Sequence, residues 1–145
     1  MTLYELRQTR PEKPVALIRL TLGSLFVISG LMKFLVPTLA KAWSAQLFAA
    51  DLPLYTLTRW TVPFVEIGVG IVLLVGLLAR PAGVVVMAIM AVATYVHVIV
   101  DDPALFPLQP SEPVIPLMVI VLSAYVIWRG AGVWSLDLKA TRAAA

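Results

Sequence analysis

Three ionisable side chains lie inside long apolar stretches of the sequence, where charged groups are rare. Lys33, Glu66 and His97 supply an ammonium, a carboxylate and an imidazole. Such groups donate and accept hydrogen bonds and transfer protons, and burial and pairing tune them for that work. An ionisable residue inside a membrane span is a functional-site hypothesis by default. These three residues are therefore the first candidates for a site, and the surrounding elements decide whether they meet.

The composition indicates that lipid is the solvent for much of the surface. Hydrophobic residues make up 61% of the chain and charged residues only 13%, whereas a soluble domain has about 25% charged residues. A length of 145 residues predicts a single domain, residues 1–145. The basic residues form no dense cluster, so nucleic acid is not an expected partner, and membrane lipid is.

Four segments come close to the roughly 20 apolar residues that a helix needs to cross the hydrocarbon core. They are residues 15–36, 61–79, 82–100 and 114–128. An open sheet would leave backbone groups without partners in lipid, so the predicted fold is all-α, an integral membrane four-helix bundle. Only Arg80 and Pro81 separate the second and third segments, which predicts a tight helical hairpin there. Residues 38–60 are predicted to form either a short interfacial helix or an ordered loop.

The basic residues also predict an orientation. Most of them flank the segment ends that share a side with the two termini: Arg7, Arg10, Lys13, Arg80, Arg129, Lys139 and Arg142. The positive-inside rule then places both termini in the cytoplasm of a bacterial-type plasma membrane, with the chain crossing several times. The polar N-terminal segment has no apolar core and is not expected to be a cleavable signal peptide.

The three candidate groups are predicted to lie at one depth. Lys33 is three residues before the outer end of its segment, Glu66 five into the next, and His97 three before the end of the third. At about 1.5 Å per residue, all three lie roughly 5–8 Å below the outer edge. Helical spacing places Lys33 and Glu66 on faces that also carry glycines, which let neighbouring helices approach closely. We therefore predict a Lys33–Glu66 ion pair, with Asp101 on the same face as His97.

Structural roles for the same residues remain open alternatives. Lys33 could reach the interface on its long stem, a Lys33–Glu66 pair could serve only to hold two helices together, and His97 could be a hydrogen-bonded core residue. Arg19 and Arg80 are predicted to be anchors or structural partners of Asp137 or Glu12, with Arg80 and Asp137 expected to pair. One histidine and scattered carboxylates predict no metal site. The chain has no cysteine, which excludes thiol catalysis and cysteine-ligated clusters.

Several motifs resemble those of the DoxX-like family of membrane proteins. "RLTLGSLFVISGLMKF" resembles the family's opening helix, with Arg19, Gly23, Gly30 and Lys33 in the family's places. "VEIGVGIVLLVGLLARPAG" resembles its second motif through Glu66, Gly70, Gly76 and Arg80, and "GAGVWSLDL" resembles its closing signature at Gly132, Ser135, Leu136 and Asp137. The resemblance implies a four-helix integral membrane protein. Some relatives are the membrane subunit of a thiosulfate:quinone oxidoreductase, and others associate with proteins of redox homeostasis.

The leading functional hypothesis is a membrane subunit of a quinone-linked redox system. Lys33, Glu66, His97 and Asp101 would then form an outer-leaflet polar pocket for a quinone headgroup. No cofactor is expected within the chain itself, so electrons would come from a soluble or membrane redox protein, and self-association is an open alternative. The other hypotheses are a non-enzymatic assembly subunit and a small transporter or lipid-binding protein. Whether the chain is an enzyme stays open, because it shows no catalytic set of its own.

Overall fold

The computed structural model describes residues 3–143, and within them every regular element is helical. The long helices are α2 (Lys13–Leu35), α4 (Tyr55–Val75), α5 (Ala79–Ile99) and α6 (Val114–Arg129). Shorter ones are α1 (Leu3–Arg7), α3 (Pro37–Ala49), the 3₁₀ helix η1 (Pro103–Leu105) and α7 (Leu136–Ala143). The predicted all-α class is confirmed for these residues.

Three helices of the described chain, α2, α4 and α5, are long and apolar enough to cross a membrane. The fourth predicted span, α6, is apolar but has 16 residues, which gives it a length of about 24 Å. Large hydrophobic side chains are exposed on all four long helices, for example Ile28, Ile71, Val92 and Val121. Such an apolar exterior is what lipid contact requires, and the chain is accordingly a multi-pass membrane protein.

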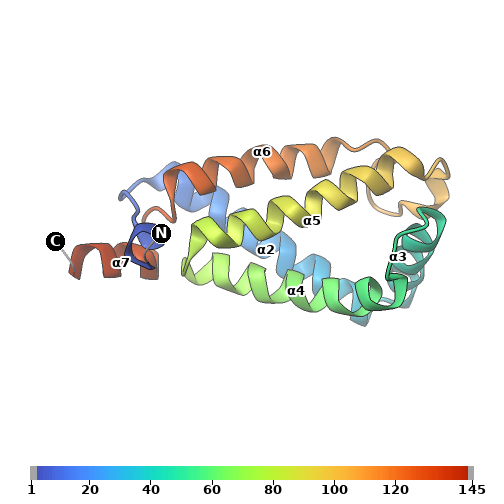
Figure 1. Cartoon of the computed structure of the whole chain (residues 1–145), viewed down its shortest axis with the longest axis horizontal. Coiled ribbons are helices and arrows are strands. Elements are labelled where there is room, and N and C mark those ends of the chain that lie inside the picture. The colour runs from blue at the N-terminus through green and yellow to red at the C-terminus, as the bar shows by residue number, and fades with distance from the viewer. Residues whose placement is uncertain (1–2, 144–145) are drawn as a thin grey trace.

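The long helices form two closely packed pairs, α2 with α4 and α5 with α6. Figure 1 shows α1 and α7 together at one end, where both termini lie, and α3 at the opposite end. We call these the terminal end and the α3 end. The main core lies between the pairs and is built from buried side chains of all four helices, including Leu22, Phe26, Leu73, Val86 and Val126.

Glycines set the contact between α2 and α4. A Cβ atom on Gly23 would lie 2.9 Å from the carbonyl oxygen of Gly70, and one on Gly70 would lie 2.8 Å from that of Gly23. One on Gly30 would lie 2.7 Å from the Pro63 oxygen. Side chains at these positions would force the helices apart, so the absence of Cβ atoms is what permits the close packing. The predicted glycine-bearing faces of α2 and α4 therefore do face each other.

The turn between α4 and α5 lies earlier in the chain than predicted. Helix α4 ends at Val75, and Gly76 follows with φ 67°, a left-handed conformation that suits glycine. The amides of Gly76 and Leu77 donate to carbonyls of the last turn of α4, and α5 begins at Ala79. Arg80 and Pro81 thus belong to the first turn of α5, where proline is tolerated, rather than to the connection.

Of the segment predicted as either a short helix or a loop, residues 38–49 are helical, as part of α3, and residues 55–60 belong to α4. Helix α3 buries Gln46 and Leu47, while Phe48 keeps 77% of its surface exposed. The Gln46 amide donates to the Leu105 carbonyl of η1 at 2.5 Å. Helix α3 therefore links the α2–α4 pair to the loop that follows α5.

Candidate functional site

Lys33 and Glu66 form the predicted ion pair. The Lys33 ammonium lies 2.7 Å from Glu66 Oε2. The side chains keep only 13% and 5% of their surface exposed. Each residue lies three positions after a member of the tight Gly30–Pro63 contact, which brings α2 and α4 close enough for the two side chains to meet. The glycine packing of the helices therefore positions the charged groups.

Two further residues, which were not predicted, complete the surroundings of Lys33. Its ammonium donates to Ser29 Oγ at 2.8 Å, and it lies 4.9 Å from the centre of the Trp43 ring, which comes from α3. The spacing of four between Ser29 and Lys33 was a usable signal, because residues i and i+4 are neighbours on a helix. Trp43 gave no such signal, since its position depends on how α3 folds back. The ammonium is thus held among protein groups rather than extended toward an interface.

This arrangement combines hydrogen-bond donors, an acceptor and an aromatic face in a nearly dry setting. The two opposite charges offset much of each other's cost of burial, and the Ser29 hydroxyl and the indole ring contribute further contacts. Lys33 is the more exposed member of the pair, with 13% of its side chain accessible against 5% for Glu66. The site can donate hydrogen bonds and protons through Lys33 and accept them through Glu66.

His97 lies in different surroundings. Its Nδ1 is 2.8 Å from the carbonyl oxygen of Ser111, and its ring packs against Phe106 with centroids 4.3 Å apart. A carbonyl only accepts, so Nδ1 carries the proton and donates it. Across residues 3–143, no hydrogen bond or ion pair joins His97 to Lys33 or Glu66.

The four residues of the predicted polar pocket therefore differ in their bonding partners. The structure brings together two of the four residues, while His97 fastens the loop after α5. Asp101 is exposed in that loop, beyond the end of α5. Two shallow hollows at the α3 end are lined by residues of α3 and α4 and by Leu54, which precedes α4. Lys33, Glu66 and His97 are not among the lining residues. Within the described residues, no three histidine or carboxylate side chains are grouped as metal ligands.

At the terminal end, Arg19 is completely buried and bonded to backbone carbonyls rather than to a carboxylate. Its guanidinium donates to Leu74 at 2.8 Å and to Ala131 at 2.9 Å. It also donates to the carbonyl of Leu73, and to those of Val133 and Trp134 at 3.4 and 3.2 Å. One side chain of α2 thus ties together the end of α4 and the segment after α6. The partners of Arg19 are thus carbonyl groups and not the carboxylates of Asp137 or Glu12 suggested for it.

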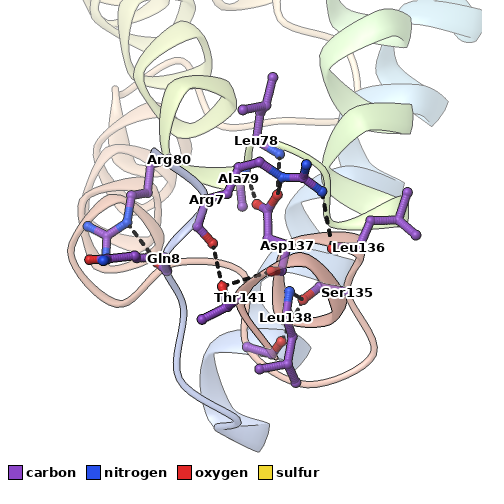
Figure 2. A network of polar contacts seen from close by, with 11 residues as sticks. Arg7, Gln8, Leu78, Ala79, Arg80, Ser135, Leu136, Asp137, Leu138 and Thr141 are labelled. Atoms are coloured by element: carbon purple, nitrogen blue, oxygen red, sulfur yellow. Dashed lines mark hydrogen bonds and ion pairs between the residues drawn. The ribbon is translucent and has the colours of Figure 1, made fainter. Parts of the chain in front are cut away.

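The predicted Arg80–Asp137 ion pair is wrong. Asp137 accepts the backbone amides of Leu78 and Ala79, each at 3.0 Å, and pairs with Arg7 Nε at 3.0 Å (Figure 2). The amides at the start of a helix attract a carboxylate strongly, because they have no partner within the helix. The Asp137 carboxylate is therefore already satisfied by the start of α5 and by Arg7.

Arg80 instead donates to the carbonyl oxygens of Gln8 at 3.2 Å and Ile127 at 2.7 Å. The other predicted carboxylate partner, Glu12, forms an ion pair with Arg129. Neither Arg19 nor Arg80 is thus paired with the carboxylates proposed for it. Sequence spacing could not reveal this, because the competing partners are backbone groups whose positions depend on the fold.

The closing motif holds α7 in place. The Ser135 hydroxyl accepts the Leu138 amide at 3.1 Å and donates to the Gly132 carbonyl at 2.7 Å, which makes Ser135 the N-cap of α7. Gly132 has φ 73°, and its amide donates to Thr9 Oγ1 at 2.8 Å. Together with Asp137, these contacts join the segments near the two termini. The contacts at the terminal end thus hold the two ends of the described chain together, and the Lys33–Glu66 pair lies toward the α3 end.

Comparison with known families gives one match. A family model described as DoxX matches residues 15–99, more than half of the chain. The matched region runs from α2 to the end of α5 and contains Lys33, Glu66 and His97, whereas the closing motif of Gly132 to Asp137 lies outside it. No curated protein and no solved structure matches the chain.

Proposed function

The chain belongs to the DoxX family of membrane proteins, and from that premise we propose that it is the membrane subunit of a quinone-linked redox system. The observation that carries the proposal is the Lys33–Glu66 pair, held nearly dry beside Ser29 and Trp43. A pair that only fastened two helices would not need an indole ring over the ammonium.

The donor set fits a quinone headgroup. A quinone has carbonyl oxygens that accept hydrogen bonds and a flat ring that favours aromatic neighbours. Lys33 would donate to a carbonyl oxygen, Trp43 would offer its ring, and Glu66 would hold the ammonium in place and accept a proton from it. When bound, the quinone would supply the electron-accepting chemistry. The exposed apolar faces of α2 and α4 would accept its hydrocarbon tail.

The electrons would come from another protein. With no cysteine and a single histidine, the chain offers neither thiols nor cysteine ligands for an iron–sulfur cluster. A soluble or membrane redox partner would therefore deliver electrons. In this proposal the enzyme is the complex of this chain with its redox partner, and this chain is the subunit that binds the quinone.

We further propose four spans, with both termini in the cytoplasm of a bacterial-type plasma membrane. Arg7 of α1 pairs with Asp137 of α7, so the two ends of the described chain meet on one side, which requires an even number of crossings. Helix α6 packs along α5 and would be the fourth span. Its modest length can be accommodated by slight thinning of the bilayer and by Arg129 at its end.

The test is quinone retention after purification in a mild detergent. Lipid extraction of the parent protein should yield bound quinone, and Lys33→Met should reduce it at least about tenfold, as expected for loss of a charge-assisted hydrogen bond. Lys139→Met, which removes an exposed lysine at the terminal end, is the matched control and should retain the parental amount. Equal quinone in Lys33→Met and the parent would refute the proposed binding role.

A second candidate is a non-enzymatic assembly subunit. It is favoured by the shallow form of the hollows at the α3 end and by the broad apolar exterior, both of which suit docking of partner helices. A stoichiometric partner protein that co-purifies without quinone would favour this function over the first.

A further inference from the structure

The two hollows at the α3 end adjoin each other and differ in character. One, of about 300 Å³, lies between α3 and α4 and is lined by Lys41, Ser44, Ala45, Phe48, Tyr55 and Arg59. The other, of about 590 Å³, is lined by Leu54, Tyr55, Thr56, Leu57 and Trp60. We call them the cationic hollow and the apolar hollow. Tyr55 lines both, so one ligand could occupy the two at once.

The cationic hollow concentrates positive charge at an otherwise acidic end of the molecule. Lys41 and Arg59 are both exposed, and within residues 3–143 neither has a carboxylate oxygen within 4.0 Å. The remaining basic residue at this end, Lys33, is occupied by Glu66. The two cations therefore remain available for an external anion.

Polar and aromatic groups define the rest of this hollow. The hydroxyl oxygens of Ser44 and Tyr55 are 2.5 Å apart, and the rings of Phe48 and Tyr55 meet edge to face with centroids 6.2 Å apart. The Arg59 guanidinium lies 5.5 Å from the Trp60 ring centre, which holds it at the border with the apolar hollow. Hydroxyls and two cations together suit a phosphate group.

The apolar hollow is open and hydrophobic. Leu54, Leu57 and Trp60 keep 73%, 56% and 55% of their surface exposed. Exposed leucines beside a tryptophan, near the end of a membrane-spanning helix, are typical of the boundary between headgroups and acyl chains. A small soluble anion would make no use of this surface, whereas an amphiphile would use both hollows.

We propose that the two hollows together bind one anionic phospholipid. Its phosphate contacts Lys41 and Arg59, and the first part of an acyl chain lies against Leu54, Leu57 and Trp60. Charge complementarity and the shared Tyr55 favour this occupant over a soluble anion. The site adjoins the buried ion pair through Trp43, whose Nε1 donates to the Arg59 carbonyl at 3.4 Å and whose ring lies 4.9 Å from the Lys33 ammonium. The proposal does not depend on quinone binding.

The test uses tryptophan fluorescence at the site itself. Trp128→Phe/Trp134→Phe removes the exposed tryptophans of the terminal end and leaves Trp43 and Trp60 as reporters. In phosphatidylcholine vesicles, phosphatidylglycerol with brominated acyl chains should quench these reporters at low mole fraction. In the same background, Lys41→Ala/Arg59→Ala should weaken this preference about thirtyfold, at roughly 1 kcal/mol for each cation.

Three controls make the outcome decisive. Lys41→Arg/Arg59→Lys keeps both charges and should bind like the parent, which separates loss of charge from loss of folding. Lys139→Ala/Arg142→Ala removes two exposed cations from the terminal end and should leave the quenching unchanged. Glycerol phosphate should not displace the lipid. Any one of three results would overturn the proposal. Brominated phosphatidylcholine could quench the reporters equally, Lys41→Ala/Arg59→Ala could leave the quenching unchanged, or glycerol phosphate could displace the lipid.

Discussion

At the scale of single residues, the Lys33–Glu66 pair is stable because each charge has the other as a partner in a nearly dry place. Removing one partner leaves a buried charge without compensation, which costs about 3–5 kcal/mol. Replacing both by apolar side chains leaves no such charge. The two kinds of change should therefore differ strongly in stability, although both abolish the pair.

A double-mutant comparison tests this. We expect Lys33→Met and Glu66→Gln each to lower the detergent-solubilised unfolding temperature, while Lys33→Met/Glu66→Leu recovers most of the loss. Thermal unfolding of the purified proteins measures it. If the double variant also retains quinone like the parent, the pair is purely structural and the proposed function is wrong. If the double variant is as unstable as the single variants, an uncompensated buried charge is not the cause of their instability.

Side-chain pairing was predictable where helical position alone decides it. Counting residues from the ends of two consecutive apolar segments gave Lys33 and Glu66 the same depth, and the structure pairs them. The predicted pairing of Asp137 with Arg80 failed, because the partners of Asp137 are the amides of Leu78 and Ala79 together with Arg7. Backbone donors carry no residue-specific signal, so a carboxylate that caps a distant helix cannot be recognised by its charge.

At the scale of elements, two glycines of α4 have sharply different environments, and only one of them lies at the contact with α2. Gly70 faces the Gly23 carbonyl oxygen, and a Cβ atom there would lie 2.8 Å from it, whereas a Cβ atom on Gly68 would have nothing within 4 Å. Both glycines lie in the same helix, only two residues apart. Alanine substitution at the two positions therefore shows whether close helix packing or helix propensity has the larger effect on stability.

We expect Gly70→Ala to destabilise the protein by about 1–3 kcal/mol, because the added methyl group overpacks the contact between helices. Gly68→Ala should change stability by no more than about 0.5 kcal/mol, or increase it slightly, since alanine favours helix. Unfolding in mixed detergent measures both variants. Equal losses at the two positions would show that the α2–α4 contact does not hold the helices together.

The elements themselves were largely predictable, and their ends were not. The long apolar segments became helices because backbone groups in lipid need partners within the same segment. The connection before α5 was misplaced because Arg80 and Pro81 resemble a turn, while the actual break is made by Gly76 in a left-handed conformation. For residues 37–49 the sequence left a helix and an ordered loop as alternatives. A short amphipathic segment becomes helical only when its apolar face packs against the rest of the protein, and the sequence does not show that packing.

At the scale of the whole molecule, charge is divided unequally between the two ends. The terminal end carries eight of the eleven basic residues, listed here in chain order: Arg7, Arg10, Lys13, Arg19, Arg80, Arg129, Lys139 and Arg142. The α3 end carries the other three and most of the acidic residues. Such a division orients a protein in a membrane whose cytoplasmic surface is negative.

This division predicts the topology, which reporter fusions can measure. A fusion partner active only in the cytoplasm, placed after Ala145, should be active, and the same partner placed after Asp51 in the connection from α3 to α4 should be inactive. A reporter that requires export should give the opposite pattern. Activity of the cytoplasmic reporter at both positions, or only after Asp51, would contradict the proposed orientation.

The buried guanidinium of Arg19 has a consequence for how the protein is made. Its carbonyl partners belong to residues 73, 74, 131, 133 and 134, so the ribosome must synthesise almost the whole chain before the last of them exists. Until residues 131–134 exist, the guanidinium lacks three of its five carbonyl partners. The contacts that hold the guanidinium of α2 against the segment after α6 can therefore form only once residues 131–134 have been made.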